Sequence, residues 1–167
     1  MNKEIERKWV IQPTFDINKI IVGKEYTVIK DHYFNRYSRL RYTKKNNDIG
    51  KWCITIKGDG TIVRDEYEFE LDKNKLDFIP TPTLNKKRYT YEYKGNKFEI
   101  NVFENISLIF RDVQFDVTDI PRPLVLVELE MNNKDQHIDI PEWFGNEVTY
   151  DKAMYGWHLF EQLKEEV

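Results

Sequence analysis

Glutamates spaced two residues apart occur in three segments of the chain, 4–6, 66–70 and 128–130. In a β-strand, residues i and i+2 lie on the same face, so each pair places two carboxylates on one wall of a sheet. Carboxylate oxygens suit hard divalent ions such as Mg²⁺ and Mn²⁺. If Glu4/Glu6 and Glu128/Glu130 lie on neighbouring strands, they predict a metal site. The alternative for any one pair is a strand face of mixed charge that meets water.

Basic residues follow the same alternation. The basic residues that stand in such segments are Lys8, Arg39, Arg41, Lys57, Arg64, Lys86 and Arg88. Arginine binds phosphate through two parallel hydrogen bonds, and lysine acts as a compact point charge. Basic side chains that converge on a metal site are what a polyphosphate chain requires. The pattern therefore favours a phosphate substrate, provided that these residues face one interior.

The alternation predicts a chain made mainly of β-strands. Strands are expected over 3–11, 25–34, 37–44, 52–57, 62–71, 86–93, 96–104 and 124–131, with hairpin turns at 46–50, 58–60 and 94–96. Apolar spacing predicts a short helix over 14–20, a helix start at 72–76 and a tail helix over 151–164 on the outside of the sheet. Residues 106–119 are either another strand pair or a surface excursion. About eight or nine strands favour an antiparallel barrel or sandwich with a few helices, an α+β chain that is mainly β.

Composition narrows the class of protein. A length of 167 residues predicts a single domain, 1–167. Lys and Arg total 26 against 29 Asp and Glu, and this net charge of -3 gives no global electrostatic basis for binding nucleic acid. The single Cys53 excludes an internal disulfide and suits a reducing compartment. Apolar runs fall short of the roughly 18 residues of a membrane helix, and no signal peptide follows Met1. We expect a soluble, cytoplasmic protein with no nucleic-acid or membrane partner.

Six motifs in order along the chain resemble the CYTH superfamily, the triphosphate tunnel metalloenzymes. Glu4-Ile5-Glu6-Arg7-Lys8 is similar to the ExExK motif of that family. The other five motifs are 39–41 (RLR), 55–57 (TIK), 64–68 (RDEYE), 86–89 (KKRY) and 127–130 (VELE). The segment 143–152 also resembles the C-terminal stretch of bacterial inorganic triphosphatases of that family. The likeness extends over nearly the whole chain.

The resemblance implies an eight-stranded antiparallel β-barrel that forms a triphosphate tunnel, open at both ends, with helices packed outside. It implies hydrolysis of inorganic triphosphate to diphosphate and phosphate, with Mg²⁺ or Mn²⁺ as the cofactor. Lys8 and Tyr33 resemble a Lys–Tyr pair proposed to activate the attacking water, and a lowered pKa would let Lys8 act as the base. The substrate-binding residues that it implies are Arg39, Arg41, Lys57, Arg64, Lys86 and Arg88. The metal ligands that it implies are Glu4, Glu6, Glu128 and Glu130, with Glu66 and Glu68 available for a second metal.

Three features depart from the family pattern. Asn101 stands where the family commonly has Asp, which removes one carboxylate and leaves the second metal site open. Ala153 follows Asp151-Lys152 where an Arg is usual, which would alter one mouth of the tunnel. The stretch 106–123 is longer than in simpler bacterial members, and it could be an added lid, a homodimer contact or neither.

Other functions remain open on this sequence. With the same fold, the small-molecule substrate could be a nucleoside or thiamine triphosphate. Asp31-His32-Tyr33-Phe34 resembles the DxYF stretch of class IV adenylyl cyclases, although no segment marks an adenine pocket. Outside the enzymes, the alternative is a polyphosphate-binding module without turnover. Asn101 favours that module, whereas the intact Glu4, Glu6 and Lys8 favour an enzyme.

Overall fold

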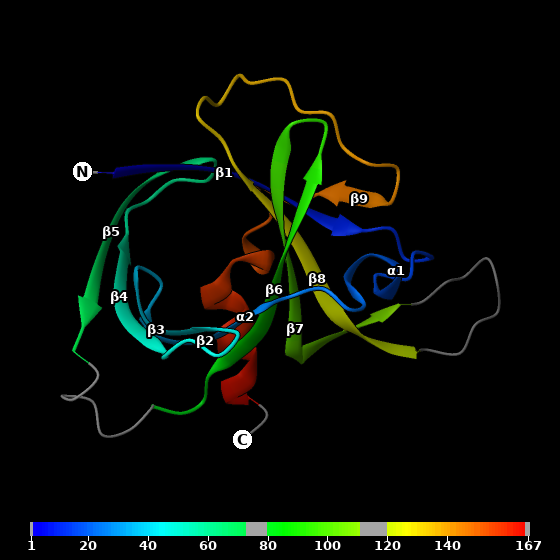
Figure 1. Ribbon diagram of the computed structural model, residues 1–167. Coiled ribbons are helices and arrows are strands. Elements are labelled where there is room, and N and C mark those ends of the chain that lie inside the picture. The colour runs from blue at the N-terminus through cyan, green and yellow to red at the C-terminus, as the bar shows by residue number, and fades with distance from the viewer. Residues whose placement is uncertain (1, 73–79, 111–119, 166–167) are drawn as a thin grey trace.

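The computed structural model describes residues 2–72, 80–110 and 120–165. Its strands are β1 Asn2–Ile11, β2 Thr27–Asn35, β3 Ser38–Lys45, β4 Lys51–Lys57, β5 Val63–Leu71, β6 Leu84–Tyr93, β7 Asn96–Phe110, β8 Ile120–Glu130 and β9 Phe144–Glu147 (Figure 1). The helices in these ranges are α1 Asn18–Ile21 and α2 Gly156–Glu165, with a 3-10 turn, η2 Lys152–Met154, before α2. None of the helices in this part of the chain is long and apolar enough to cross a membrane.

Eight of the strands form a closed antiparallel barrel. Their order is β5-β4-β3-β2-β6-β7-β8-β1, and β1 also pairs with β5, which closes the ring. At the closing seam Glu4 lies opposite Arg64, and across the β1–β8 pair Lys8 lies opposite Glu128. The ninth strand, β9, adds to the end of β1. The predicted mainly β, eight-stranded antiparallel barrel with few helices is confirmed.

Alternation along β1 separates a charged interior from an apolar exterior. Lys8 faces the interior, whereas Trp9 points outward and is only 2% exposed. The Trp9 ring packs against Phe98 and Phe144, with centroids 6.0 and 5.5 Å away. Ile17 and Ile21 from the α1 region join the same cluster. Most of the hydrophobic stabilisation at this side of the barrel therefore comes from its outside, which frees the interior for charged residues.

A two-residue turn joins β6 to β7. Lys94 and Gly95 both have positive φ, 45° and 80°, which is the backbone of a type I′ hairpin. This turn sets the register in which Arg88 lies opposite Asn101 and Lys86 opposite Phe103. The hairpin predicted around 94–96 is confirmed, and it brings two predicted phosphate-binding residues beside Asn101.

Helix α2 lies across one end of the barrel, beside β2 and β6 (Figure 1). Its Leu159, Phe160 and Leu163 pack in one cluster with residues of β2, β6, β7 and β8. These strand residues include Tyr33 and Leu84, which face the interior and line its cavity. The helix was expected on the outside of the sheet. It covers this end instead, because the inner wall turns from charged to apolar there and offers the helix a partner.

Other differences from the expected elements concern short segments. The helix expected over 14–20 is shorter and begins later, at Asn18–Ile21. The strand β9 was not predicted, since four residues are too few to show a periodic pattern. β7 continues through 106–110, in agreement with the strand option for the start of that stretch. Residues 111–119 and most of the helix start expected at 72–76 lie outside the described residues.

Candidate active site

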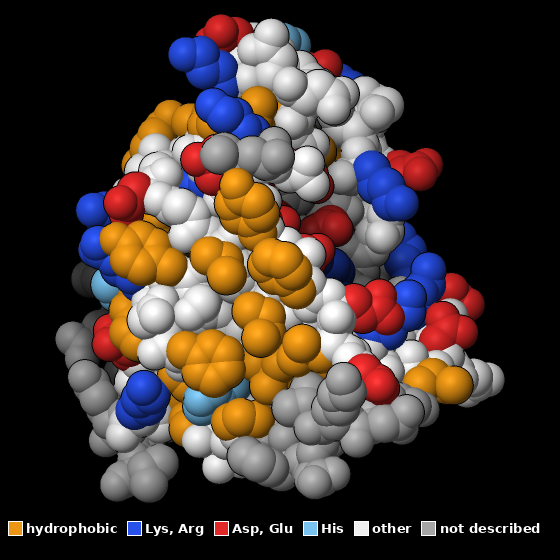
Figure 2. Space-filling view, turned by 90° about the vertical axis from the view of Figure 1, so that its left-hand side faces the viewer, with side chains coloured by type: hydrophobic (Ala, Val, Ile, Leu, Met, Phe, Trp, Pro, Cys, Tyr) orange, Lys and Arg blue, Asp and Glu red, His pale blue; other side chains and the backbone are white. Residues whose placement is uncertain are grey.

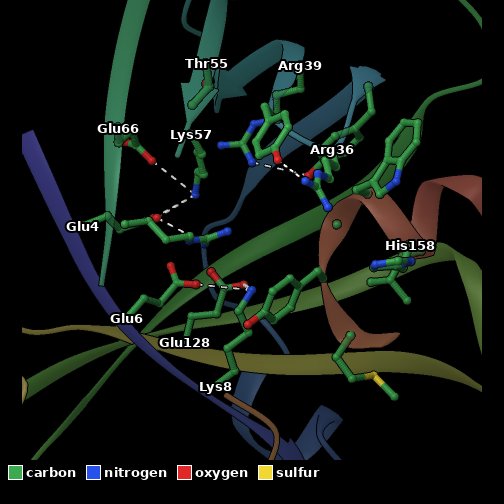
Figure 3. A pocket seen from close by; sticks show the side chains of 18 of the residues that line it. Glu4, Glu6, Lys8, Arg36, Arg39, Thr55, Lys57, Glu66, Glu128 and His158 are labelled. Atoms are coloured by element: carbon green, nitrogen blue, oxygen red, sulfur yellow. Dashed lines mark hydrogen bonds and ion pairs between the residues drawn. The ribbon is translucent and has the colours of Figure 1, made fainter. Parts of the chain in front are cut away.

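All fourteen residues that the sequence singled out for catalysis, phosphate binding or metal binding line one cavity of about 340 Å³ inside the barrel. They come from β1, β2, β3, β4, β5, β6 and β8. Figure 3 shows side chains from several of these strands pointing toward one another across the cavity. Nine Lys or Arg and eight Asp or Glu belong to its lining, so positive and negative charges are close to balance.

The first group of charges lies at the seam between β1 and β5. Lys57 Nζ donates to the two oxygens of Glu4 at 2.8 and 2.9 Å and lies 3.2 Å from Glu66 (Figure 3). Arg64 donates to the same Glu4 carboxylate at 3.2 Å. Burial and the neighbouring Arg39 lower the pKa of Lys57 more than Glu4 raises it. Glu4 is thus shared by two cations, either of which an incoming anion can attract.

The second group surrounds Lys8. Its Nζ lies 3.3 Å from Glu6 and 3.5 Å from Glu128 (Figure 3). Burial alone would lower the pKa of Lys8, but Glu128 and Glu6 outweigh burial and raise this pKa above its ordinary value. In turn Lys8, with Lys86 and Arg88, holds the pKa of Glu128 well below its usual range against the effect of burial. The lowered pKa expected for Lys8 is not observed, because two carboxylates share its ammonium.

Lys8 and Tyr33, predicted as a pair, have different hydrogen-bond and ion-pair partners among the described residues. The Tyr33 hydroxyl accepts a hydrogen bond from Arg39 at 3.4 Å, and no hydrogen bond among the described residues joins it to Lys8. Gly156, at the start of α2, packs so closely on this hydroxyl that a Cβ there would overlap it. Tyr33 therefore connects the cavity wall to α2.

Tyr155 is the aromatic residue beside Lys8. Its ring centroid lies 5.5 Å from Lys8 Nζ and 5.6 Å from Arg64 Cζ, within the range of cation–π attraction. Tyr155 also donates a hydrogen bond to the carbonyl of Thr149 at 3.1 Å. One ring thus joins two of the predicted site residues to the C-terminal segment.

The third group is centred on Asp31, which is 1% exposed. Its two oxygens accept hydrogen bonds from Arg41 at 2.7 and 2.8 Å, and Arg39 Nε lies 3.8 Å away. Burial would raise the pKa of Asp31, but Arg41 and Arg39 hold it well below its usual range. Arg41 commits two donor atoms to this pair and keeps its remaining N–H groups for the cavity.

On the wall formed by β6 and β7, unlike in the three groups above, a buried lysine lies without an ion-pair partner among the described residues. Lys86 is 6% exposed and takes part in no ion pair among the described residues, and its Nζ lies 5.6 Å from the Phe103 ring centroid. Burial, with Arg88 and Arg41, lowers the pKa of Lys86 well below its ordinary value. Beside it, the fully buried Asn101 accepts a hydrogen bond from Arg88 Nε at 2.8 Å.

Carboxylates crowd Glu130 at another part of the cavity. Burial and repulsion from Glu4, Glu99, Glu6 and Glu66 raise the pKa of Glu130. Within the described ranges no ion pair includes Glu130, and no three acidic, His or Cys residues already stand as a metal-ligand group. A hard divalent cation relieves such crowding through oxygen ligands, so the donor set fits Mg²⁺ or Mn²⁺ chemically.

The segment that contains Glu147 and Thr149, after β8, is hydrogen-bonded to the backbone of Lys8. Thr149 Oγ1 accepts a hydrogen bond from Lys8 N at 3.0 Å and donates one to Glu147 at 2.8 Å. Glu147 accepts two hydrogen bonds from Arg7, at 2.6 and 2.8 Å. Arg7 is not among the residues that line the cavity, and its bonds to Glu147 hold the segment that carries Tyr155.

The sequence analysis missed several residues of the site, among them Asp31, Glu99 and Tyr155. Asp31 and Glu99 follow the strand alternation, so that signal could have found both; Glu99 lies opposite Glu128 and 3.2 Å from Arg88. Tyr155 had no comparable signal, since it enters the cavity from the non-strand segment before α2.

No protein-family model matches the chain. An inorganic triphosphatase of Nitrosomonas europaea is 28% identical over 159 residues, which cover 89% of this chain and 91% of that protein. Two crystal structures of NE1496, one described as an inorganic triphosphatase and one as a hypothetical protein, share the fold. Their TM-scores are 0.54 and 0.52 at 24% and 25% identity. They cover 96% and 94% of this chain, and 95% and 97% of their own chains. With the motifs and the charged barrel interior, these similarities support the resemblance to a CYTH triphosphatase-like family.

Proposed function

We propose that this protein hydrolyses inorganic triphosphate to diphosphate and phosphate, with Mg²⁺ or Mn²⁺ as its cofactor. The observation that carries the proposal is the convergence of seven basic and six acidic predicted residues on one cavity. The relative named inorganic triphosphatase supports the choice of substrate, since the similarity extends over most of both chains.

The charge of the substrate favours a role for divalent cations. Triphosphate carries roughly four to five negative charges, counting about two per terminal phosphate. The lining offers nearly equal numbers of positive and negative side chains, so the polyanion needs counter-ions beyond those of the protein. Glu4, Glu6, Glu128 and Glu130 would hold the first ion, with Glu66 and Glu68 as further ligands. A bound Mg²⁺ or Mn²⁺ would neutralise charge on phosphoryl oxygens.

The basic residues would bind and orient the phosphates. Arg41 can keep its bond to Asp31 and donate its remaining N–H groups to a phosphate oxygen. Lys57 and Arg64 would exchange part of their contact with Glu4 for the substrate. In phosphoryl transfer most of the catalysis comes from positioning and from stabilising the charge on the leaving group, which suits these cations.

In the proposed reaction Lys8 would act in its protonated, positively charged form. While Glu6 and Glu128 hold it, Lys8 stays protonated and can donate to a phosphate oxygen. It can act as a base only when these two carboxylates are engaged by another cation. Tyr33 keeps its place as a contact between Arg39 and α2.

Phosphate release from inorganic triphosphate, ATP and thiamine triphosphate tests the proposal, with Mg²⁺, Mn²⁺ or a chelator in parallel. We expect strong release from inorganic triphosphate that the chelator abolishes. Release from an organic triphosphate alone would move the assignment to that substrate. Conversion of ATP to diphosphate without free phosphate would indicate a cyclase. Binding of triphosphate without turnover of any substrate would indicate a binding module.

A further inference from the structure

Asn101 lies on the inner wall of β7 between Glu99 and Phe103, both of which line the cavity. It is fully buried, and its Oδ1 accepts a hydrogen bond from Arg88 Nε at 2.8 Å. Because Arg88 can only donate, this bond fixes which end of the amide is oxygen. The amide nitrogen, Nδ2, has no hydrogen-bond partner among the described residues.

Lys86 is the diagonal neighbour of Asn101 on β6, since Lys86 lies opposite Phe103 and Arg88 opposite Asn101. The charged groups that act on Lys86 are Arg88 on its own strand, Arg41 of β3, Asp31 of β2 and Glu128 of β8. The two acidic groups, Asp31 and Glu128, are already paired with other basic side chains. Asp31 accepts two hydrogen bonds from Arg41, and Glu128 pairs with Lys8 and Arg88. Lys86 is thus a buried cation at the cavity wall whose acidic neighbours are engaged by other bases.

We propose that Asn101 determines the affinity of the cavity for polyphosphate by keeping Lys86 without an internal counter-ion. An aspartate would have the same size, and its carboxylate would pair with Arg88 and attract Lys86. The neutral amide holds Arg88 in place through one hydrogen bond and leaves Lys86 to take its counter-charge from the ligand. Asn101 is therefore a positioning residue that acts through its two neighbours. The inference rests on the proposed function, since it takes a polyphosphate as the ligand.

Anion binding should then be coupled to a proton. Burial, with Arg88 and Arg41, lowers the pKa of Lys86 in the free protein. A phosphate oxygen beside Lys86 favours its charged form and raises this pKa. The affinity for triphosphate should therefore fall as the pH rises through the pKa of Lys86 in the free protein.

Calorimetric titration with inorganic triphosphate in the presence of a chelator tests the inference. The proteins compared are the wild type, Asn101→Asp and Asn101→Ser, at pH 7 and pH 9. We expect Asn101→Asp to bind at least tenfold more weakly than the wild type at pH 7. Asn101→Ser, which stays neutral, should bind within about threefold of the wild type. The wild type should lose more affinity than Asn101→Asp between the two pH values. Equal affinity of wild type and Asn101→Asp would overturn the inference.

Carbon-13 NMR of the lysine side chains gives a measurement that needs no ligand. A Lys86→Arg variant identifies the resonance of Lys86. An added carboxylate within about 4–6 Å shifts a neighbouring pKa by about one to three units, so Asn101→Asp should raise the Lys86 midpoint by about one unit or more. Asn101→Ser should leave it near the wild-type value, and an unmoved midpoint in Asn101→Asp would refute the role of Asn101. If the wild type binds no triphosphate, the proposed function fails, and the NMR result still decides whether Asn101 controls Lys86.

Discussion

The acidic residues of the cavity differ in the partners that surround them. Glu4 and Glu128 each face two basic side chains, whereas Glu130 faces other carboxylates. Glu4 and Glu128 would have to give up part of these contacts to bind a divalent cation. Glu130 has no ion pair to lose among the described residues, and a divalent cation would relieve the repulsion from its neighbours.

Glu4→Gln and Glu130→Gln should each abolish metal-dependent hydrolysis while leaving the barrel folded. A lost carboxylate ligand removes several kcal/mol of charge stabilisation, a loss of roughly 100-fold or more in rate. Phosphate release and circular dichroism measure the two effects. Glu142→Gln, at an exposed position outside the cavity, is the control and should keep full activity. Full activity in both cavity variants would exclude these residues as metal ligands.

Lys8→Ala should lower kcat much more than it raises KM, because a charge that stabilises the transition state is lost. We expect a loss of about 10²–10³ in kcat, as for other donors to developing charge. Lys8→Arg keeps the charge but not a group that can deprotonate, and it should recover at least tenfold over Lys8→Ala. If Lys8→Arg is as inactive as Lys8→Ala, the lysine must lose its proton and act as the base.

Asp31→Asn should destabilise the fold at neutral pH by about 3 kcal/mol, because it leaves buried guanidinium charge without a counter-ion. The pKa of Asp31 is depressed in the folded protein, so its stabilisation is fully present above its ordinary value of about 3.9 and is lost as the pH falls below it. Urea unfolding of the wild type and the variant from pH 7 to pH 3 measures this. The difference should shrink at the acid end, and a constant difference would contradict the charge pairing.

At the scale of elements, α2 and the segment before it cover one end of the barrel and contribute residues to the lining of its cavity. Phe160 is fully buried and packs on Tyr33 and on Trp157. Thr149, which follows β9, bonds to Lys8 and Glu147 through its side chain. Its carbonyl accepts a hydrogen bond from Tyr155 and so positions that ring. These elements contribute little of the charge, yet they decide how Lys8 and the α2 end of the cavity are arranged.

Gly156→Ala should displace the start of α2, because its Cβ would overlap the Tyr33 hydroxyl. Overpacking of this kind typically costs about 1–3 kcal/mol, which thermal and urea unfolding can detect. Activity should fall as well, since Trp157 and Leu159 line the cavity. Gly58→Ala is the matched control, because its Cβ would make an ordinary contact with Asp65 Cβ at 3.5 Å. Equal effects of the two substitutions would argue against the packing of α2 on Tyr33.

At the scale of the whole molecule, the barrel encloses a group of charged side chains and exposes apolar side chains on part of its outer surface. Figure 2 shows a group of hydrophobic side chains on one face of the molecule. Ile56 and Tyr67, which lie opposite each other on β4 and β5, are among the exposed large hydrophobic residues, as is Phe69, two residues further along β5. The burial of charge in the interior makes the folded state sensitive to anions and divalent cations that enter it.

Inorganic triphosphate and Mg²⁺ together should raise the thermal stability of the protein. A ligand at about 100 times its Kd adds about 2.7 kcal/mol to the folded state. For a chain of this size that corresponds to a rise in Tm of roughly 5–10 °C. Differential scanning calorimetry measures the shift, with sodium sulfate at matched ionic strength as the control. A shift of the same size in sulfate would show a general salt effect rather than a polyphosphate site.

The sequence by itself determined the wall that each strand residue faces. A period of two over Glu4 to Lys8, Glu66 to Glu70 and Lys86 to Arg88 needs only the pleat of a strand. For this reason the charged strand residues of the candidate site could be predicted from local spacing. The same signal was present at Asp31 and Glu99, where it was not used. The choice of a barrel over a sandwich and the inclusion of Tyr33 came from the resemblance to the CYTH superfamily.

Only the tertiary structure decided which charges meet and what closes the barrel. Lys8 lies between Glu6 and Glu128, because β1 pairs with β8 in one register. The direction of its pKa follows from those distances, which no spacing along the chain encodes. The position of α2 likewise depends on the apolar end of the interior, which forms only when residues from four strands come together. Local alternation fixes the face of a residue, whereas partners and pKa values depend on contacts between segments far apart in the sequence.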